Sequence, residues 1–423
     1  MTFVGMKEGV SGPLVGYLQS ILSKIGFNPG RTDCIFGPRT KDAVLRFQEK
    51  TSVFADGRVG NETFSALLPY LRGWFEYSPE ENEDIAAVAA KFSSPTALLN
   101  AANPEKTDGK ITVPIFYNTV PADVPYCHEI LEFNLQNLVK RFPFVSLFSI
   151  GKSVLGKEIY ALKIGDGEKE IFYNGAHHAN EWITIPVLLK FAEQLACAYA
   201  ESGRIFGQSA RKLFSAASVY IAPCVDPDGV DLVTGELTGG EYYDAALRIA
   251  QSYPDVPFPS GWKANIRGVD LNLQYPAGWE QARENKFALG IVSPAPADYV
   301  GASPLSAPES RAMYDFTLSL SPQLTLAYHT QGEVIYWRYL DLEPRGARDI
   351  ADTFAAVSGY SAEDTPFASG FAGYKDWYIR EFDRPGYTVE AGLGKNPLPL
   401  SQFDKIYADN LGILTLSPFL VAH

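Results

Sequence analysis

Residues 169–184 read KEIFYNGAHHANEWIT, and this stretch decides the fold of the larger part of the chain. Its first eight residues, 169–176, have the apolar character of a strand, and a polar group that includes two histidines and Glu181 follows. From Trp182 to Ala200 the apolar residues recur at helical spacing. A strand that passes through polar residues into a long helix is the repeating unit of an α/β fold, in which ligands bind at the carboxyl ends of the strands.

The same alternation of strand and helix patterns continues from about Tyr126 to the end of the chain. Residues 217–223, for example, form a second apolar strand pattern. Strands that alternate with helices indicate a sheet covered on both faces. We therefore predict an α/β domain over residues 119–423, with a mixed central sheet and helices on both faces.

The composition excludes several classes of protein. The chain has 423 residues and a formal net charge of −13, which does not favour nucleic acid or an anionic membrane surface as a partner. No apolar run reaches the roughly 18 residues of a membrane span, and residues 1–13 lack the pattern of an export signal, so we expect a cytoplasmic protein. The four cysteines lie far apart and predict neither a disulfide framework nor a cysteine-rich metal site.

Polar side chains follow other predicted strands as well. His329 comes directly after the apolar segment 324–328, and Glu390 ends the segment 386–390. His178 and Glu181 are three residues apart, so both can point at one ion from the same face of a helical turn. Taken singly, each feature also has a structural interpretation. Glu181 could be a first-turn acid of a helix, His329 a hydrogen-bonded core residue, and Glu390 an ordinary edge residue.

The order of these elements, H-x-x-E-W, then H, then a strand ending in T-V-E, resembles that of the zinc carboxypeptidases, the carboxypeptidase A-like family. The resemblance covers about residues 126–423 and extends to three further motifs, Asp226–Gly229, Gly268–Asn272 and Asp376–Trp377. It implies that His178, Glu181 and His329 hold one zinc ion per chain, with a water on the fourth position. The family spacing selects His178 over the adjacent His177.

The resemblance also implies roles for three charged residues beside the zinc. Glu390 matches the general base that takes a proton from the zinc-activated water. Asp270 matches the carboxylate that accepts a hydrogen bond from a ligand histidine and fixes its tautomer. Lys263 stands where the family has an arginine that polarises the scissile carbonyl, and it keeps the positive charge without the planar fork.

The substrate-binding residues depart from the family pattern. The Asn-Arg pair that clamps the terminal carboxylate of a substrate is Asn272-Leu273 here, and a tyrosine of the family is replaced by Ala368. Leucine cannot hold a carboxylate, so we expect little preference for a free chain end. Asn272 remains a candidate substrate-binding residue. Lys375, at the position that lines the family's specificity pocket, is either a surface lysine or a cation that pairs with an extra carboxylate of the substrate, such as one from diaminopimelate or D-glutamate.

Residues 12–70 contain an internal repeat, in which 33–40 and 56–63 both read D-x-x-[FV]-G-x-x-T. Each copy places a glycine-containing turn before a helical pattern, and another helical pattern precedes them. This three-helix unit, to which we assign residues 1–73, resembles the peptidoglycan-binding domain of many cell-wall hydrolases. The alternative is a helical bundle that binds no wall polymer.

Residues 74–118 form a second predicted module. Helical patterns at 85–92 and 97–99 precede a short strand at 111–114. This order resembles a degenerate LysM module, which binds chains containing N-acetylglucosamine through a strand-helix-helix-strand fold. A plain linker domain is the alternative.

The modules together with residues 178–184, HANEWIT, and 262–265, WKAN, resemble the γ-D-glutamyl-L-diamino-acid endopeptidases, a subgroup of the family. The implied reaction is hydrolysis of the bond between γ-D-glutamate and meso-diaminopimelate, or lysine, with peptidoglycan or muropeptides as partners. The alternatives are a metallocarboxypeptidase acting on ordinary peptides and a catalytically silent wall-binding protein. For the biological setting we expect recycling of wall fragments or wall remodelling during sporulation.

Overall fold

The structure is a computed structural model that describes residues 1–104, 109–115 and 118–421. It divides into two compact units, one of Met1–Ser146 with Glu193–Gly203 and the other of Leu147–Ala192 with Arg204–His423. The division of the sequence into three domains, with boundaries after residues 73 and 118, stays a prediction.

Three helices begin the first unit, as the repeat and the apolar spacing predict. They are α1 Pro13–Lys24, α2 Pro38–Lys50 and α3 Asn61–Arg72. Each follows a glycine, and proline occupies the first turn of α1 and α2, where its missing N–H costs no hydrogen bond. The three helices bury apolar side chains such as Leu18, Phe47 and Leu67.

A buried glutamine from the preceding helix binds each copy of the repeat. Nε2 of Gln19 lies 2.9 Å from both Asp33 Oδ1 and Thr40 Oγ1, and its Oε1 accepts hydrogen bonds from the backbone N–H of residues 33 and 34. Gln48 repeats this pattern with Asp56 and Thr63, and its Oε1 accepts from the backbone N–H of residues 56 and 57. These networks fix the turn before α2 and the turn before α3. They explain why each copy of the repeat begins with aspartate and ends with threonine.

A strand-helix-helix-strand segment follows α3. It consists of β1 Trp74–Tyr77, α4 Ile85–Phe92, α5 Thr96–Ala102 and β2 Ile111–Pro114, with β1 and β2 antiparallel. The helices and β2 lie where the sequence predicts them. Helix α6, His128–Arg141, also groups with this unit, where Arg141 forms a buried ion pair of 2.8 Å with Glu193.

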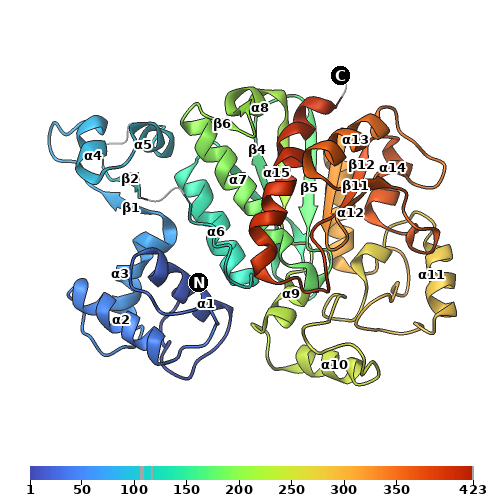
Figure 1. Cartoon of the computed structure of the whole chain (residues 1–423), viewed down its shortest axis with the longest axis horizontal. Helices are drawn as coiled ribbons and strands as arrows, with labels where there is room; N and C mark the ends of the chain where they lie inside the picture. The colour runs from blue at the N-terminus through green and yellow to red at the C-terminus, as the bar shows by residue number, and fades with distance from the viewer. Residues whose placement is uncertain (105–108, 116–117, 422–423) are drawn as a thin grey trace. The chain divides into compact units, whose positions relative to one another are not determined.

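The second unit is built on an eight-stranded sheet with the order β11-β10-β12-β9-β5-β8-β4-β3 in the described part of the chain (Figure 1). Strands β12, β9, β5 and β8 are mutually parallel, whereas β10 is antiparallel to β12 and β4 to β8. The predicted mixed central sheet is therefore confirmed. The strands are β3 Ser146–Lys152, β4 Glu158–Ile164, β5 Glu170–Gly175, β8 Ser218–Ala222, β9 Leu324–His329, β10 Val334–Tyr336, β11 Ser361–Glu363 and β12 Gly386–Glu390.

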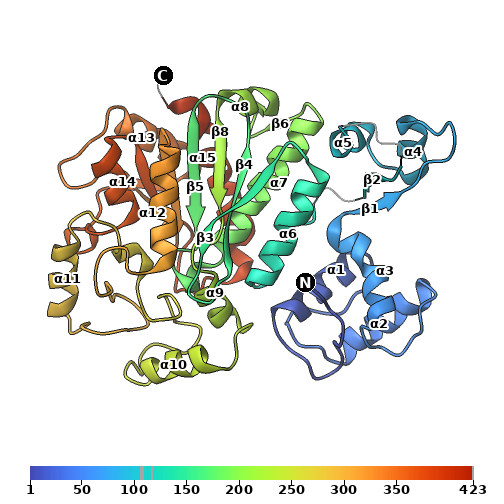
Figure 2. The same cartoon turned by 180° about the vertical axis from the view of Figure 1, so that it is seen from behind.

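Helices cover both faces of this sheet, because successive residues of a strand point to opposite sides. Phe172 of β5 packs against Phe316 of α12, and its neighbour Tyr173 donates a hydrogen bond to the carbonyl of Leu414 in α15. Helices α7, α13 and α15 lie in front of the sheet in Figure 1, and α12 covers it in Figure 2. The helices of these layers are α7 Thr184–Ala200, α12 Pro308–Leu320, α13 Ala347–Ser358, α14 Tyr374–Phe382 and α15 Phe403–Leu420.

Shorter elements connect the layers. They are the two-stranded ribbon β6 Arg204–Ile205 with β7 Gln208–Ser209, the helices α8 Ala210–Ala216, α9 Pro227–Thr234, α10 Glu241–Ala250 and α11 Trp279–Ala288, and the 3-10 turns η1 Ala179–Glu181, η2 Leu271–Leu273, η3 Phe367–Ser369 and η4 Leu400–Gln402. Among the described helices, none combines the length and the apolar composition that a membrane crossing requires.

Three buried carboxyl groups gather beside α9. Asp226, Asp228 and Glu309 are fully buried. Oδ1 of Asp226 accepts a hydrogen bond from Gly229 N and caps α9, but Oδ2 has no hydrogen-bond partner among the described residues. Burial, together with the nearby charge of Glu309, holds the pKa of Asp226 well above its ordinary value.

Candidate active site

Three adjacent parallel strands end at the candidate site. Strand β5 leads into η1, which is preceded by His178 and ends at Glu181, while β9 ends at His329 and β12 at Glu390. In the register of β9 and β12, His329 and Glu390 are direct partners. Since the carboxyl ends of parallel strands meet at one edge of a sheet, the topology brings together residues that are far apart in sequence.

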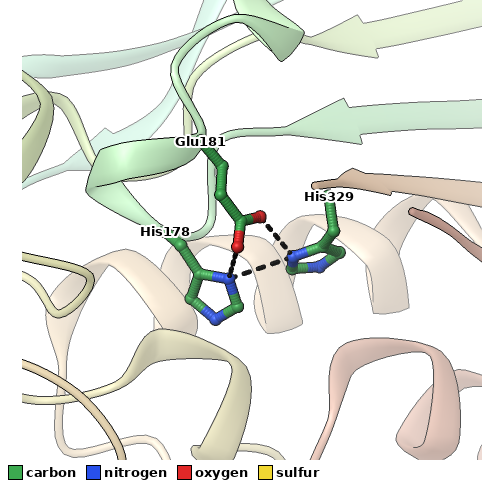
Figure 3. Close-up of side chains that lie close together, drawn as sticks. All are labelled: His178, Glu181 and His329. Atoms are coloured by element: carbon green, nitrogen blue, oxygen red, sulfur yellow. Dashed lines mark hydrogen bonds and ion pairs between the residues drawn. The ribbon is translucent and has the colours of Figure 1, made fainter. Parts of the chain in front are cut away.

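The side chains of His178, Glu181 and His329 converge on one point (Figure 3). Nδ1 of His178 lies 2.9 Å from Glu181 Oε1, and Nδ1 of His329 lies 3.0 Å from Glu181 Oε2. The two Nδ1 atoms are 3.1 Å apart. All three residues are buried, and His178 also lines the neighbouring cavity.

The donor set of this cluster fits a zinc ion. Nε2 of His178 faces Asp270 Oδ1 at 3.2 Å, which places the ring proton on Nε2 and leaves the lone pair of Nδ1 directed into the cluster. That lone pair meets a carboxylate and a second imidazole nitrogen, an assembly of acceptors that a cation would stabilise. Two imidazole nitrogens and one carboxylate are a known ligand set for catalytic zinc. Although burial alone would lower the pKa of His178, the Glu181 charge raises it to about 9, which shows the same demand for positive charge.

His177 is not part of this cluster. Its Nε2 lies 3.0 Å from the hydroxyl of Tyr275, and its ring stacks on that of His329 with centroids 5.7 Å apart. The geometry therefore separates the two adjacent histidines in the way that the family spacing predicts. The other two histidines are elsewhere: His128 begins α6, and His423 lies outside the described residues.

Asp270 links the cluster to Lys263. Its Oδ1 faces His178, and its Oδ2 lies 3.6 Å from Lys263 Nζ. The charges of Lys263 and His178 hold the pKa of Asp270 far below its ordinary value in spite of burial. In return, Asp270 and Glu181 raise the pKa of Lys263, so that the ammonium stays charged although burial opposes it.

Glu390 lines the cavity at the end of β12, beside His329. Burial, and then the charge of Glu181, raise the pKa of Glu390 to about 8, against the opposing effects of His178 and Lys263. A carboxyl group with a pKa close to neutral can both take up and release a proton, as a general base requires.

A cavity of about 240 Å³ opens from this cluster. Its lining includes Leu273 and six of the predicted residues, which are His178, Lys263, Asp270, Asn272, Lys375 and Glu390. Oδ1 of Asn272 accepts a hydrogen bond of 2.9 Å from Tyr374 N, so this residue also holds the start of α14 in place. Ala368 lies in the exposed turn η3.

Lys375 is buried, with 3 % of its surface exposed, so its interpretation as a surface lysine is wrong. Its Nζ lies 2.5 Å from both Asp376 Oδ1 and the carbonyl oxygen of Arg338, and 3.1 Å from Thr365 Oγ1. The ammonium lines the cavity and already has three oxygen neighbours.

Four residues of the site escape the motif analysis. The backbone N–H of Thr330 and the Asn396 side chain donate to Glu181 at 3.1 and 3.4 Å. The N–H of Asp298 donates to Asp270, while its carboxylate pairs with Lys286 at 2.5 Å. Asp298 and Asn396 lie in loops without periodic pattern, so the sequence offers no signal for them.

Comparison with known proteins gives two family matches. The family described as "Zinc carboxypeptidase" matches residues 131–411, and the one described as "Putative peptidoglycan binding domain" matches residues 11–67.

Two curated proteins are similar over most of their length. The chain is 42 % identical to gamma-D-glutamyl-L-diamino acid endopeptidase 1 of Lysinibacillus sphaericus, over 70 % of this chain and 72 % of that protein. It is 41 % identical to the protein YqgT of Bacillus subtilis strain 168, over 68 % and 76 % of the two chains.

Among solved structures, the carboxypeptidase A of Helicoverpa armigera is similar with a TM-score of 0.55 at 20 % identity, over 79 % of this chain and 80 % of that one. Bovine thrombin-activatable fibrinolysis inhibitor is similar with a TM-score of 0.52 at 19 % identity, over 69 % and 95 %. At this level of identity the likeness shows a shared fold.

Proposed function

The chain belongs to the zinc carboxypeptidase family, and from this premise we propose that it hydrolyses the bond between γ-D-glutamate and meso-diaminopimelate, or lysine, in peptidoglycan stem peptides. The observation that carries the proposal is a complete cluster of His178, Glu181, His329 and Glu390, in a cavity where Leu273 replaces the carboxylate clamp of a carboxypeptidase. The relative in Lysinibacillus sphaericus, whose name states this bond, and the peptidoglycan-binding match support it.

The chemistry divides among a few residues. Zinc held by His178, Glu181 and His329 supplies Lewis acidity, which makes a water nucleophilic at neutral pH and stabilises developing negative charge. A carboxylate oxygen of Glu390 accepts the proton of the attacking water and can pass it to the leaving amine. The ammonium of Lys263 supplies a fixed positive charge beside the carbonyl oxygen under attack.

The missing clamp favours cleavage within a chain over removal of its last residue. Leu273 is buried against Trp279 and Phe371, and it offers no donor to a terminal carboxylate. A metallocarboxypeptidase acting on ordinary peptides is the second candidate, because the rest of the catalytic set is the same.

For substrate recognition we propose that Lys375 binds an extra carboxylate, from diaminopimelate or D-glutamate, and that Asn272 binds the peptide. Support comes from the placement of both residues in the cavity wall. A carboxylate that approaches Lys375 would compete with Asp376 for its ammonium. Unchanged cleavage by Lys375→Ala would count against this role.

For the modules that precede the catalytic region we propose binding to peptidoglycan. The match over residues 11–67 supports this for the three-helix unit. The β1-α4-α5-β2 order supports a LysM-like module that binds sugar chains containing N-acetylglucosamine. A cytoplasmic site of action, on recycled wall fragments or during sporulation, stays a proposal.

The proposed function is tested with purified protein and muropeptides that contain L-Ala-γ-D-Glu-meso-diaminopimelate. Mass spectrometry should show release of L-Ala-γ-D-Glu that a chelator prevents and that Glu390→Gln reduces by about two to four orders of magnitude. Release of only a carboxy-terminal residue would instead favour the second candidate function, that of a metallocarboxypeptidase. No products from a zinc-loaded protein would contradict the proposal.

A further inference from the structure

The two copies of the repeat differ in charge, although their glutamine networks are the same. The sequence alignment of the copies places Arg31 and Arg39 of the first opposite Phe54 and Glu62 of the second. The first turn of α3 therefore carries an acid, Glu62, where the first turn of α2 carries none. The same alignment places Ile35 opposite Arg58, so the first copy presents two arginines and an isoleucine where the second presents a phenylalanine, an acid and one arginine. These surface differences point to different tasks, because the glutamine networks that fix the two turns are the same.

A groove lies on the first copy. It is lined by Gln19, Pro29, Arg31, Asp33, Ile35, Gly37, Pro38, Arg39 and Thr40, and has a volume of about 430 Å³. The stem of Arg39 lies across Gly30, where a Cβ atom would come within 3.1 Å of its Cδ. Gly30 has φ +92°, so glycine is favoured there and leaves room for this side chain.

The two arginines of the groove, Arg31 and Arg39, form no ion pair or hydrogen bond with other described residues. Asp33 is the one acid in the lining. Its Oδ1 accepts hydrogen bonds from Gln19 Nε2 and Ile35 N, and these bonds hold its pKa below the ordinary value. The groove therefore has two cations, Arg31 and Arg39, and one anion, Asp33, which already accepts hydrogen bonds from other groups.

The apolar part of the lining is small and open. Ile35 is 55 % exposed, and two prolines flank the arginines. The lining residues include no aromatic ring on which a sugar could stack. Two guanidinium groups beside a small apolar surface are complementary to a carboxylate that is attached to short aliphatic side chains.

We propose that this groove, lined by Arg31, Arg39 and Ile35, binds the carboxylate-bearing stem peptide of peptidoglycan, not its glycan backbone. The proposal rests on the proposed function for its polymer, and it adds the component that is recognised and the residues that recognise it. In intact strands the sugars are neutral, because the lactyl carboxylate of muramic acid forms the amide with the stem. The free carboxylates belong to the stem, on D-glutamate and on diaminopimelate.

The test is co-sedimentation of the full chain with teichoic-acid-free sacculi, in a Glu390→Gln background that suppresses hydrolysis. Arg31→Ala/Arg39→Ala should weaken binding at least tenfold at low salt, with a smaller difference at high salt. A matched pair, Lys50→Ala/Arg58→Ala, removes two exposed cations of the same helical unit outside the groove and should change binding less than twofold. The pair Arg31→Lys/Arg39→Lys keeps the charge and should retain part of the binding, which separates a lost site from a misfolded unit.

Two further substrates distinguish the ligands. Sacculi whose carboxyl groups are amidated, and chitin, a chain of N-acetylglucosamine without carboxyl groups, should bind the parent no better than they bind the double alanine variant. Equal binding of the parent to chitin and to intact sacculi would overturn the proposal, and so would unchanged binding of the double variant to intact sacculi. With Glu390 intact, the double variant should hydrolyse the soluble tripeptide with a kcat/KM within twofold of the parent. Loss of hydrolysis in all proteins would contradict the proposed function alone.

Discussion

The glutamine networks of the first unit and the histidine-glutamate cluster of the second are both buried and polar, yet they are completed in opposite ways. The amide group of Gln48 brings donors and an acceptor, and the chain supplies matching partners for each. In the cluster, when the ring protons of both histidines are on Nε2, the Nδ1 atoms of His178 and His329 and the carboxylate of Glu181 all present lone pairs. A buried polar group whose partners are complete supports structure, whereas a gathering of acceptors requires an ion from outside.

The carboxyl groups beside α9 form a third case. Asp226, Asp228 and Glu309 bring together more acceptors than the surrounding donors satisfy. No metal-ligand geometry appears there among the described residues. The raised pKa of Asp226 indicates that a proton completes this cluster.

The largest effect is expected where an ion completes the cluster. His329→Ala removes one of three zinc ligands, so zinc content should fall from one per chain to near zero after dialysis, and hydrolysis of the tripeptide should fall at least about 1,000-fold. Elemental analysis and product release measure the two effects. His177→Gln is the control, because His177 bonds to Tyr275 outside the cluster, and it should keep its zinc. Loss of zinc from His177→Gln together with its retention in His329→Ala would reverse the assignment of ligands.

Breaking the complete hydrogen-bond network of Gln48 should lower the stability of the fold without changing the hydrolytic reaction. Gln48→Leu leaves the backbone N–H groups of residues 56 and 57 without their acceptor, and we expect it to lower the free energy of unfolding of this helical unit by roughly 3 kcal/mol. Hydrogen exchange of the amides in α1, α2 and α3 measures the change. Gln136→Leu, at an exposed position of α6, should have an effect below about 0.5 kcal/mol. An equal effect of the two variants would show that the network is dispensable.

The residue that orients a ligand should matter less than the ligand itself. Asp270→Asn weakens the acceptor for the Nε2 proton of His178, so the Kd for zinc should rise about 10- to 100-fold. Competition with a chelator of known affinity measures it. Asp298→Asn alters a carboxylate that pairs with Lys286, while Asp298 reaches Asp270 only through its backbone, and it should change the Kd less than threefold. Similar Kd values for Asp270→Asn and the parent would contradict the orienting role.

The smallest effect concerns the proton beside α9. The pKa of Asp226 is higher in the folded chain than in the unfolded chain, so its protonation stabilises the fold at low pH, and that contribution is lost as the pH rises through the folded-state value. Asp226→Asn removes this titrating group, so it should stabilise the fold more at pH 8 than at pH 5. The two gains in the free energy of unfolding should differ by roughly 1 kcal/mol, and melting temperatures at the two pH values measure the difference. Asp315→Asn, at an exposed position of α12, is the control. If Asp226→Asn changed the stability equally at both pH values, Asp226 would not take up a proton in the folded chain.

The sequence predicts the fold where the chain follows local rules. The alternation around residues 169–200 and the strand patterns at 324–329 and 386–390 correspond to β5, α7, β9 and β12. The order of the strands in the sheet does not follow from such patterns, because β5 pairs with β8 and β9 through contacts between distant segments. The first strand of the small module, β1, also has no alternation long enough to identify it.

The site is predictable to the extent that its residues lie in motifs. His178, Glu181, His329, Glu390 and Asp270 are where the family order places them. The burial of Lys375, by contrast, depends on Asp376, Thr365 and a backbone carbonyl that tertiary packing supplies. The donors from Thr330 and Asn396 to Glu181 likewise become visible only once the loops are folded.

The distance along the chain between the two histidine ligands has a consequence for how the protein forms. His178 and His329 are separated by 151 residues, and they meet only after β5 and β9 have paired. Contacts at such long range form late, since a long loop must first close. A growing chain therefore cannot acquire its zinc, or its hydrolytic activity, until most of the sheet has been synthesised and assembled. Metal uptake then reports that β5 and β9 have paired, and it stabilises the folded state at that moment.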